Sequence, residues 1–137
     1  MIALLAMLAI GQVATRDYPT RVVSCYDADT CALEIVEPSA SIFSAIDLVH
    51  HESARLCGIN APEMKGATLE AAKRSRDTLL SWIKATKIVT FRPALKNGRA
   101  DREKYGRLLG WLVADGVVLN ELLVTSGLAV RYIECAE

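Results

Sequence analysis

Alternating apolar and polar positions predict two strands near the start of the chain. Residues 22–26 (VVSCY) form one strand pattern, and the apolar Cys31, Leu33 and Ile35 alternate with their neighbours through residue 36. The turn-forming segment Asp27-Ala28-Asp29-Thr30 lies between the two patterns. We therefore predict an antiparallel hairpin over residues 22–36.

Residues 37–52 mix a proline, small residues and scattered apolar residues without a sustained period, so we expect a long irregular excursion there. A third strand is predicted over 54–59. It ends at Asn60-Ala61-Pro62-Glu63, because proline cannot donate to a strand ladder and restricts the residue before it.

The clearest helical pattern covers residues 68–84, where the apolar positions fall near one face. Glu70 near its start and Lys84 near its end suit the helix dipole. Strands are predicted over 87–92 and 107–114, and a short helix is predicted from Asn120, as its cap, to residue 128.

Turns are predicted at Asn97-Gly98 and Asp115-Gly116. Five strands and two helices without regular βαβ alternation favour a small, partly closed β-barrel over a doubly wound sheet. At 137 residues the chain has room for one ordinary domain.

Charge and composition narrow the function classes. Hydrophobic residues make up 52% of the chain, and sixteen Lys and Arg balance sixteen Asp and Glu. A core can form, but no global positive field exists to hold nucleic acid non-specifically. Any anion site must be local, and residues 96–107 contain a basic stretch that could steer a phosphate backbone or simply solubilise a loop.

Residues 1–15 form an apolar leader that begins MIALLAMLAI. It is too short to span a bilayer, which takes about 20 residues. An export signal is one interpretation, although no Lys or Arg precedes the apolar run. A retained N-terminal anchor and an ordinary packed helix are the alternatives, so the protein is expected to be exported or membrane-anchored.

Four cysteines, at positions 25, 31, 57 and 135, contain no C-x-x-C pair, which argues against a zinc site. The even count suits an oxidising compartment. Across the predicted hairpin, Cys25 and Cys31 would be neighbours that a disulfide can bridge. Alternatively, these cysteines are small core residues.

Four charged residues stand where a structural role does not require them: Asp29, Arg55, Glu63 and Arg107. Phosphodiester hydrolysis needs a hard cation, a positioned water and donors for the extra transition-state charge. A carboxylate such as Asp29 suits calcium or magnesium, arginine forks grip phosphate oxygens, and Glu63 has the chemistry of a general base. Considered one at a time, each of these residues could instead have a purely structural role, as a turn former or an ion-pair partner.

The order of these motifs resembles the staphylococcal-nuclease-like (thermonuclease) family. The matching segments are Asp27-Ala28-Asp29-Thr30, residues 55–63 (RLCGINAPE), and Lys104-Tyr105-Gly106-Arg107, with a helix between the last two. The resemblance spans about residues 21–133. It implies an oligonucleotide/oligosaccharide-binding (OB) barrel and calcium-dependent cleavage of DNA and RNA that leaves 5′-hydroxyl and 3′-phosphate ends.

The resemblance also implies roles for individual residues. Asp29 and the backbone carbonyl of Ala61 match calcium ligands, Glu63 matches the general base, and Arg55 and Arg107 match the phosphate-binding pair. Asn60 stands where the best-known member has a second metal-binding aspartate. We expect it to ligate through its amide oxygen and the site to bind calcium more weakly, because ligand charge is a main determinant of calcium affinity.

Two further departures concern the frame of the fold. The segment between Cys31 and Arg55 is longer than in the best-known member, and that member's third helix has no counterpart before Glu137. We expect exposed barrel surface to need another cover, for which residues 1–14 are one candidate.

Minor signals carry less weight. His50-His51-Glu52 has the composition of a metal site, but adjacent residues on an extended chain point to opposite faces, so a solvated loop is favoured. Trp82 and Trp111 could stack on bases, but tryptophans in such elements are more often core residues.

The sequence therefore predicts a monomeric, calcium-dependent nuclease acting on DNA or RNA, with no stable protein partner implied. The main alternative is a catalytically silent OB-fold module that binds nucleic acid or protein, and a poorly folded nuclease fragment is a third. A metal-dependent nicking assay separates the first two, and a cooperative thermal melt tests the third.

Overall fold

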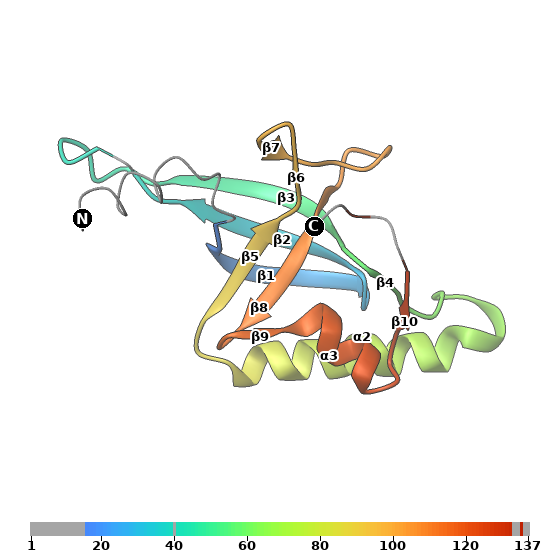
Figure 1. Ribbon diagram of the computed structural model, residues 1–137. Coiled ribbons are helices and arrows are strands. Elements are labelled where there is room, and N and C mark those ends of the chain that lie inside the picture. The colour runs from blue at the N-terminus through green and yellow to red at the C-terminus, as the bar shows by residue number, and fades with distance from the viewer. Residues whose placement is uncertain (1–15, 40, 133–134, 136–137) are drawn as a thin grey trace, which may run out of the picture.

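The computed structural model describes residues 16–39, 41–132 and 135, and Figure 1 shows a barrel of strands lying against two helices. The apolar leader predicted over residues 1–15 lies outside the described residues.

Five strands form the barrel: β1 (Tyr18–Asp27), β2 (Thr30–Glu37), β3 (Leu48–Leu56), β5 (Val89–Pro93) and β8 (Leu108–Ala114). The sheet order β3-β2-β1-β5-β8 closes on itself because β3 also pairs with β8, in parallel. The predicted five-stranded barrel is confirmed.

Short strands complete the connections. These are β4 (Ile59–Asn60), β6 (Leu95–Lys96), β7 (Arg99–Ala100), β9 (Val117–Val118) and β10 (Val130–Arg131). β4 pairs with β10, while β6 and β7 form a hairpin around Asn97-Gly98. Both turn residues have positive φ, as do Asp115 and Gly116 between β8 and β9, so both predicted turns are confirmed.

Helix α2 (Leu69–Ala85) follows the 3₁₀ turn η1 (Gly66–Thr68) and confirms the helix predicted over 68–84. It packs against β1 and buries Ala72, Ser75 and Leu79 on one face. Helix α3 (Leu119–Thr125) packs against β8. Among the described residues after α3, no further helix forms.

Asn120 does not cap helix α3, and that prediction is wrong. It lies inside the helix, is completely buried, and turns its side chain to the barrel. Its amide nitrogen donates to the carbonyl oxygens of Cys57 (2.9 Å) and Gly110 (3.2 Å), and its amide oxygen accepts the N–H of Leu112 (3.1 Å). Asn120 thus joins α3, the turn between β3 and β4, and β8 through buried backbone groups.

The irregular excursion predicted over residues 37–52 is also wrong in part. Strands β2 and β3 stay paired from Thr30↔Arg55 to Glu37↔Leu48, so only residues 38–47 connect them. The outer part of this hairpin projects beyond the barrel with both faces exposed, so its side chains follow no burial period in the sequence.

The core lies inside the barrel and against the helices, around Leu33, Leu56, Phe91 and Leu112. Where β5 crosses β8, a Cβ on Gly110 would lie 2.4 Å from both the Arg92 carbonyl oxygen and the Phe91 ring, so the close approach requires glycine. Trp82 packs on the main core cluster and Trp111 on a second one, which agrees with the prediction that both are core residues.

Two disulfides link the four cysteines. Cys25–Cys31 joins register partners of the first hairpin, as its predicted geometry allows. Cys57–Cys135 links Cys135 to the turn between β3 and β4. None of the helices in the described part of the chain has the length and apolar character needed to cross a membrane.

Candidate functional site

The turn of the first hairpin places Asp29 at one end of the barrel. Its backbone oxygen accepts the Leu56 N–H (2.7 Å), which fixes the turn against the end of β3, and the residue is only 7% exposed. The Asp29 carboxylate is a hydrogen-bond hub: one oxygen accepts the Thr30 hydroxyl (2.9 Å), and the other accepts the Ala61 N–H (2.7 Å). Asp29 is thus held in place by residues from both sides of the site.

Arg55 extends from β3 into the same end of the barrel and is nearly buried. Its Nη1 lies 3.3 Å from Asp29 Oδ2 and donates to the Leu56 carbonyl oxygen (3.2 Å), while Nη2 donates to the amide oxygen of Asn60. The predicted metal ligand Asn60 therefore lies beside Asp29, and its amide oxygen is hydrogen-bonded to Arg55.

Asp27 is an acidic residue of the site that the sequence analysis treated only as part of a turn. It is half-buried, and its Oδ1 accepts the Asp29 N–H (3.1 Å). Burial, followed by hydrogen bonding with and charge repulsion from Asp29, raises the pKa of Asp27 to about 7. The D-x-D spacing in the turn was the available signal, since both carboxylates sit at one hairpin end.

Arg107 lies just before β8 and reaches back across the first hairpin. Its Nη1 donates to the Thr30 hydroxyl (3.3 Å) and its Nη2 to Glu103 (3.2 Å). Among the buried side-chain nitrogen and oxygen atoms of the described residues, Arg107 Nε alone has no hydrogen-bond partner. A guanidinium donor is therefore fixed in the site with hydrogen-bonding capacity to spare.

Glu103, which the sequence analysis missed, holds Arg107. The hydrogen bond from the Arg107 side chain, and then its charge, lower the pKa of Glu103 below its ordinary value, so this carboxylate stays ionised. Four residues separate the two in the loop before β8, a spacing with no recognisable pattern outside a helix.

Glu63 lies after β4, on the segment that leads to η1. Its side chain is 73% exposed, and its carboxylate lies 3.3 Å from Lys65 Nζ. Its backbone oxygen accepts the Thr68 hydroxyl (2.6 Å) and the Lys65 N–H (2.8 Å), which fixes the local turn. Glu63 is therefore a solvent-accessible carboxylate on an anchored backbone.

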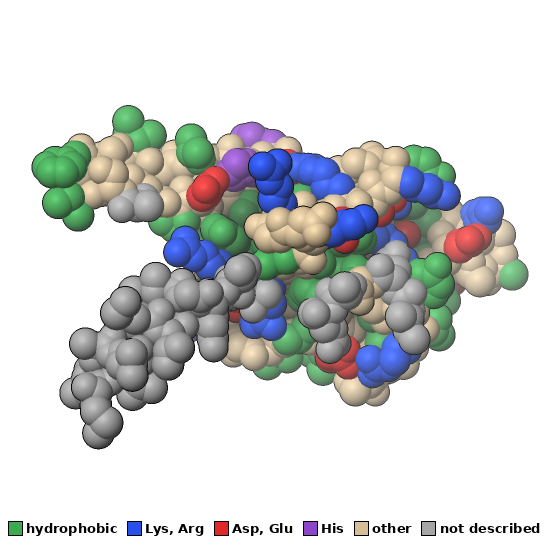
Figure 2. Space-filling model, turned by 45° about the horizontal axis from the view of Figure 1, so that its top comes forward, with side chains coloured by type: hydrophobic (Ala, Val, Ile, Leu, Met, Phe, Trp, Pro, Cys, Tyr) green, Lys and Arg blue, Asp and Glu red, His purple; other side chains and the backbone are tan. Residues whose placement is uncertain are grey.

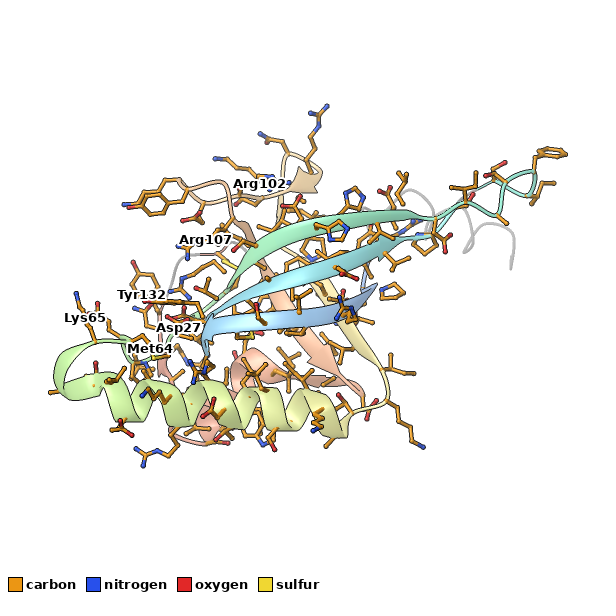
Figure 3. The ribbon with its side chains drawn as sticks, turned by 180° about the vertical axis from the view of Figure 1, so that it is seen from behind. Asp27, Met64, Lys65, Arg102, Arg107 and Tyr132 are labelled. Carbon is orange, nitrogen blue, oxygen red and sulfur yellow. A yellow bond between two sulfur atoms is a disulfide. The ribbon has the colours of Figure 1, made fainter. Side chains whose placement is uncertain are left out.

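One open pocket of about 330 Å³ brings the predicted side chains together. Its lining consists of Tyr26, Asp27, Asp29, Thr30, Arg55, Asn60, Ala61, Glu63 and Arg107. Figure 3 shows this end of the barrel, with Asp27 at the tip of the first hairpin and Arg107 above it. Every residue assigned a site role from the sequence lines this pocket.

The donor set of the pocket suits a hard divalent cation. The described residues contain no cluster of three or more acidic, His or Cys side chains arranged to hold a metal. The pocket instead offers the carboxylates of Asp27 and Asp29, the amide of Asn60 and backbone oxygen at Ala61. These are oxygen ligands of the kind that calcium accepts, and a cation would relieve the repulsion that raises the pKa of Asp27.

The tract His50-His51-Glu52 lies away from this pocket, in β3 rather than in the solvated loop expected for it. His50 pairs with Glu37 (2.8 Å), and Glu52 pairs with Arg102 (2.8 Å). The tract's side chains thus bind separate partners on neighbouring elements.

Comparison with known proteins adds independent evidence. No curated protein gives a significant match to the chain. The family model described as staphylococcal nuclease homologue matches residues 53–137, a range that includes Arg55, Asn60, Glu63 and Arg107, and the barrel brings Asp29 to them from outside that range. With more than half of its length matched, the chain belongs to the staphylococcal nuclease homologue family.

Proposed function

We propose that the protein is a calcium-dependent phosphodiesterase that hydrolyses DNA or RNA. The observation that carries this proposal is the single pocket that gathers two arginines, two buried or half-buried aspartates and an accessible glutamate. Nuclease chemistry is what such a group can perform, since it combines phosphate binding, a cation site and a base.

Arg55 and Arg107 bind the scissile phosphate in this proposal. Both guanidinium groups line the pocket, and arginine remains charged at any relevant pH. The Nε–H of Arg107 has no partner but is buried, so it becomes a donor for a non-bridging oxygen when the guanidinium turns toward the pocket. Arg55 turns from its bonds to Asp29 and Asn60 or shares them with the phosphate.

Asp29, the Ala61 carbonyl and Asn60 would hold calcium, and Asp27 adds a second carboxylate beside them. Bound there, a calcium ion supplies charge stabilisation at a non-bridging phosphate oxygen. Because an amide stands at position 60, Asp27 and Asp29 provide the negative charge of the proposed site.

Glu63 orients and deprotonates the attacking water. Its exposure gives it direct access to solvent water, and its exposed ion pair with Lys65 costs little to break. Its anchored backbone limits how far the carboxylate can move from the phosphate. By its family, the reaction leaves 5′-hydroxyl and 3′-phosphate ends.

The cellular setting belongs to the same proposal. Two disulfides and no free cysteine among the described residues support an oxidising compartment, outside the cytosol. We propose that the protein acts there as a monomer on nucleic acid, exported or attached to the membrane through its N-terminal segment.

The test is plasmid nicking and cleavage of labelled single-stranded DNA and RNA across a calcium titration, with and without a chelator. We expect calcium-dependent cleavage, and Arg107→Ala to reduce it about 100-fold or more. Arg131→Ala is the matched control, because Arg131 forms a similar pair with Glu121 outside the pocket.

Cleavage that ignores calcium and the chelator would reject the metal assignment. A wild-type protein that binds labelled DNA without cleaving it at any calcium concentration would favour the catalytically silent module. The structural argument for that outcome is that Arg55 already occupies the amide oxygen of Asn60, a proposed calcium ligand.

A further inference from the structure

The outer end of the β2–β3 hairpin is an exposed apolar tip, which we define as the described residues 38, 39 and 41–49. Ile42 and Phe43 are each 93% exposed, and Ile46 is 77% exposed. Leu48 and Val49, at its base, are more than half exposed. Figure 2 shows these hydrophobic side chains at the end of a projection from the barrel. Apolar patches of this kind mark interaction sites.

We propose that this hairpin tip inserts into the interfacial region of a lipid bilayer. The tip has the charge distribution that insertion requires: residues 38–46 contain no ionisable side chain. The first carboxylate after them, Asp47, already accepts the N–H of Ser39 (2.9 Å). Entry of residues 38–46 into lipid therefore dehydrates no ionisable side chain, and Asp47 stays at the boundary of the inserted part.

Four backbone N–H groups of the tip form hydrogen bonds within the tip itself. Serine hydroxyls accept the N–H groups of Ser41 (3.4 Å), Phe43 (3.1 Å) and Ile46 (3.3 Å), and the carbonyl oxygen of Ser41 accepts that of Ser44 (3.3 Å). A bilayer offers the backbone no hydrogen-bond partners, so a segment that enters it must satisfy its polar groups internally. Four N–H groups of the tip are already paired, which lowers the cost of moving it out of water. A protein partner could pair such groups itself, so this internal pairing favours lipid.

The direction of β1 places the start of this strand at the same end of the barrel as the base of the tip. Because β1 runs antiparallel to β2, with Thr20 opposite Ile35, the chain enters the barrel at Tyr18 on the side where β2 leaves it for the tip. The uncharged sequence MIALLAMLAI precedes that entry point. Stable membrane attachment generally takes two weak signals, and the sequence before β1 contains a second uncharged apolar segment.

This arrangement orients the pocket. From the pair Thr30↔Arg55, which lines the pocket, to Glu37↔Leu48 at the base of the tip is seven residues along β2. At about 3.3 Å per residue, the pocket lies about 23 Å from the base of the tip. Figure 3 shows Asp27 and Arg107 at one end of the barrel and the projecting hairpin at the other. A protein inserted by its tip would hold the pocket open to the solution.

A site-specific fluorescence experiment on the full chain tests this. Phe43→Trp places a probe in the tip, and Ile88→Trp places one at an exposed position between α2 and β5. With phosphatidylcholine vesicles, we expect the Phe43→Trp emission, after subtraction of wild type, to shift to the blue and to be quenched by brominated lipid. The Ile88→Trp probe should show neither change. An unchanged Phe43→Trp spectrum overturns the proposal, even if the chain binds vesicles elsewhere.

Vesicle flotation supplies the second readout. The triple variant Ile42→Ser, Phe43→Ser, Ile46→Ser should lower the partition coefficient about tenfold or more, because most of the inserted apolar surface is lost. The matched control Val23→Ser, Ile88→Ser, Val117→Ser removes three exposed apolar side chains from other surfaces and should bind like wild type.

Because the tip has no net basic charge, binding should persist at about 0.5 M salt, where surface electrostatics are screened. Equal partitioning of the two triple variants overturns the proposal. So does concentration-dependent self-association, without lipid, that the Ile42/Phe43/Ile46 variant abolishes, since the tip would then bind a second copy. Neither result bears on nuclease activity, which is assayed separately.

Discussion

Glu103 forms two hydrogen bonds with Arg107: one carboxylate oxygen accepts the backbone N–H of Arg107 at 2.9 Å, and the other accepts a hydrogen bond from Nη2 at 3.2 Å. Nη1 is left to bond Thr30, and Nε remains free. The position of the guanidinium is therefore fixed from the side of the loop.

Glu103→Gln should lower the cleavage rate about 10- to 100-fold, because Arg107 would remain in the site but would no longer be held in position for the phosphate. As a positioning residue, Glu103 should affect KM and kcat together, and the melting temperature should change little. Glu121→Gln is the matched control, because it loosens the exposed arginine Arg131 outside the pocket. Wild-type kinetics in Glu103→Gln would show that Arg107 needs no such support.

Glu63→Gln should reduce cleavage about 10²- to 10⁴-fold, the contribution expected of a general base. Because the side chain is 73% exposed, the free energy of unfolding should stay within about 0.5 kcal/mol of wild type. Single-turnover cleavage and urea denaturation measure the two effects. Glu70→Gln, at the exposed start of α2, serves as control, and comparable rates in the two variants would remove Glu63 from the mechanism.

Asn60→Asp should lower the half-saturating calcium concentration about tenfold, because it adds a negative charge to the proposed ligand set. Calorimetric calcium titration of the free protein measures this independently of activity. Ser81→Asp adds the same charge on the exposed surface of α2 and should leave calcium binding unchanged. A calcium affinity unaffected by Asn60→Asp would place the cation away from position 60.

Asp27 should make the calcium-free protein less stable as pH rises. Its pKa is raised to about 7 in the folded state from 3.8, so the folded protein holds a proton that the unfolded chain releases. The stabilisation is complete below about pH 3.8 and is lost as pH approaches 7.

Comparing Asp27→Asn with wild type from pH 5 to 7.5, in chelator, isolates this effect. Wild type should lose on the order of 1 kcal/mol relative to the variant, a figure reduced for the half-exposed position. Calcium should restore wild-type stability at pH 7.5 and leave the variant less affected. Parallel pH profiles for the two proteins would contradict the raised pKa.

Asn120→Ala should destabilise the fold by about 2 to 3 kcal/mol, because it removes the side-chain partner of the buried Cys57 carbonyl and Leu112 N–H. The Gly110 carbonyl keeps the Cys57 N–H (2.8 Å). Urea unfolding measures the loss, and Ser81→Ala on the surface of α2 should cost less than about 0.5 kcal/mol. A loss no greater than that of the surface variant would mean that water replaces the amide.

Local sequence signals predicted the elements that local chemistry controls. The period of residues 68–84 specified helix α2 to within one residue at each end, and Asn97-Gly98 specified its turn because few other pairs tolerate positive φ at both positions. The projecting half of β3 showed no alternation of apolar and polar residues. Its pairing with β2 depends on backbone hydrogen bonds, and its side chains face water.

The sequence by itself determined which chemical groups the protein carries: an acidic hairpin turn, two arginines in otherwise apolar or loop surroundings, and a glutamate after a strand-ending proline. Only the tertiary structure decided which of them meet. The parallel pairing of β3 with β8 sets Arg55 opposite Leu109 and so carries Arg107 to Thr30, 77 residues away in the chain. Such contacts depend on barrel closure and strand register, which many distant backbone bonds fix together, so no short segment encodes them. The roles of Asp27, Glu103 and Asn120 became visible only there, because each is defined by its partners rather than by its neighbours in the sequence.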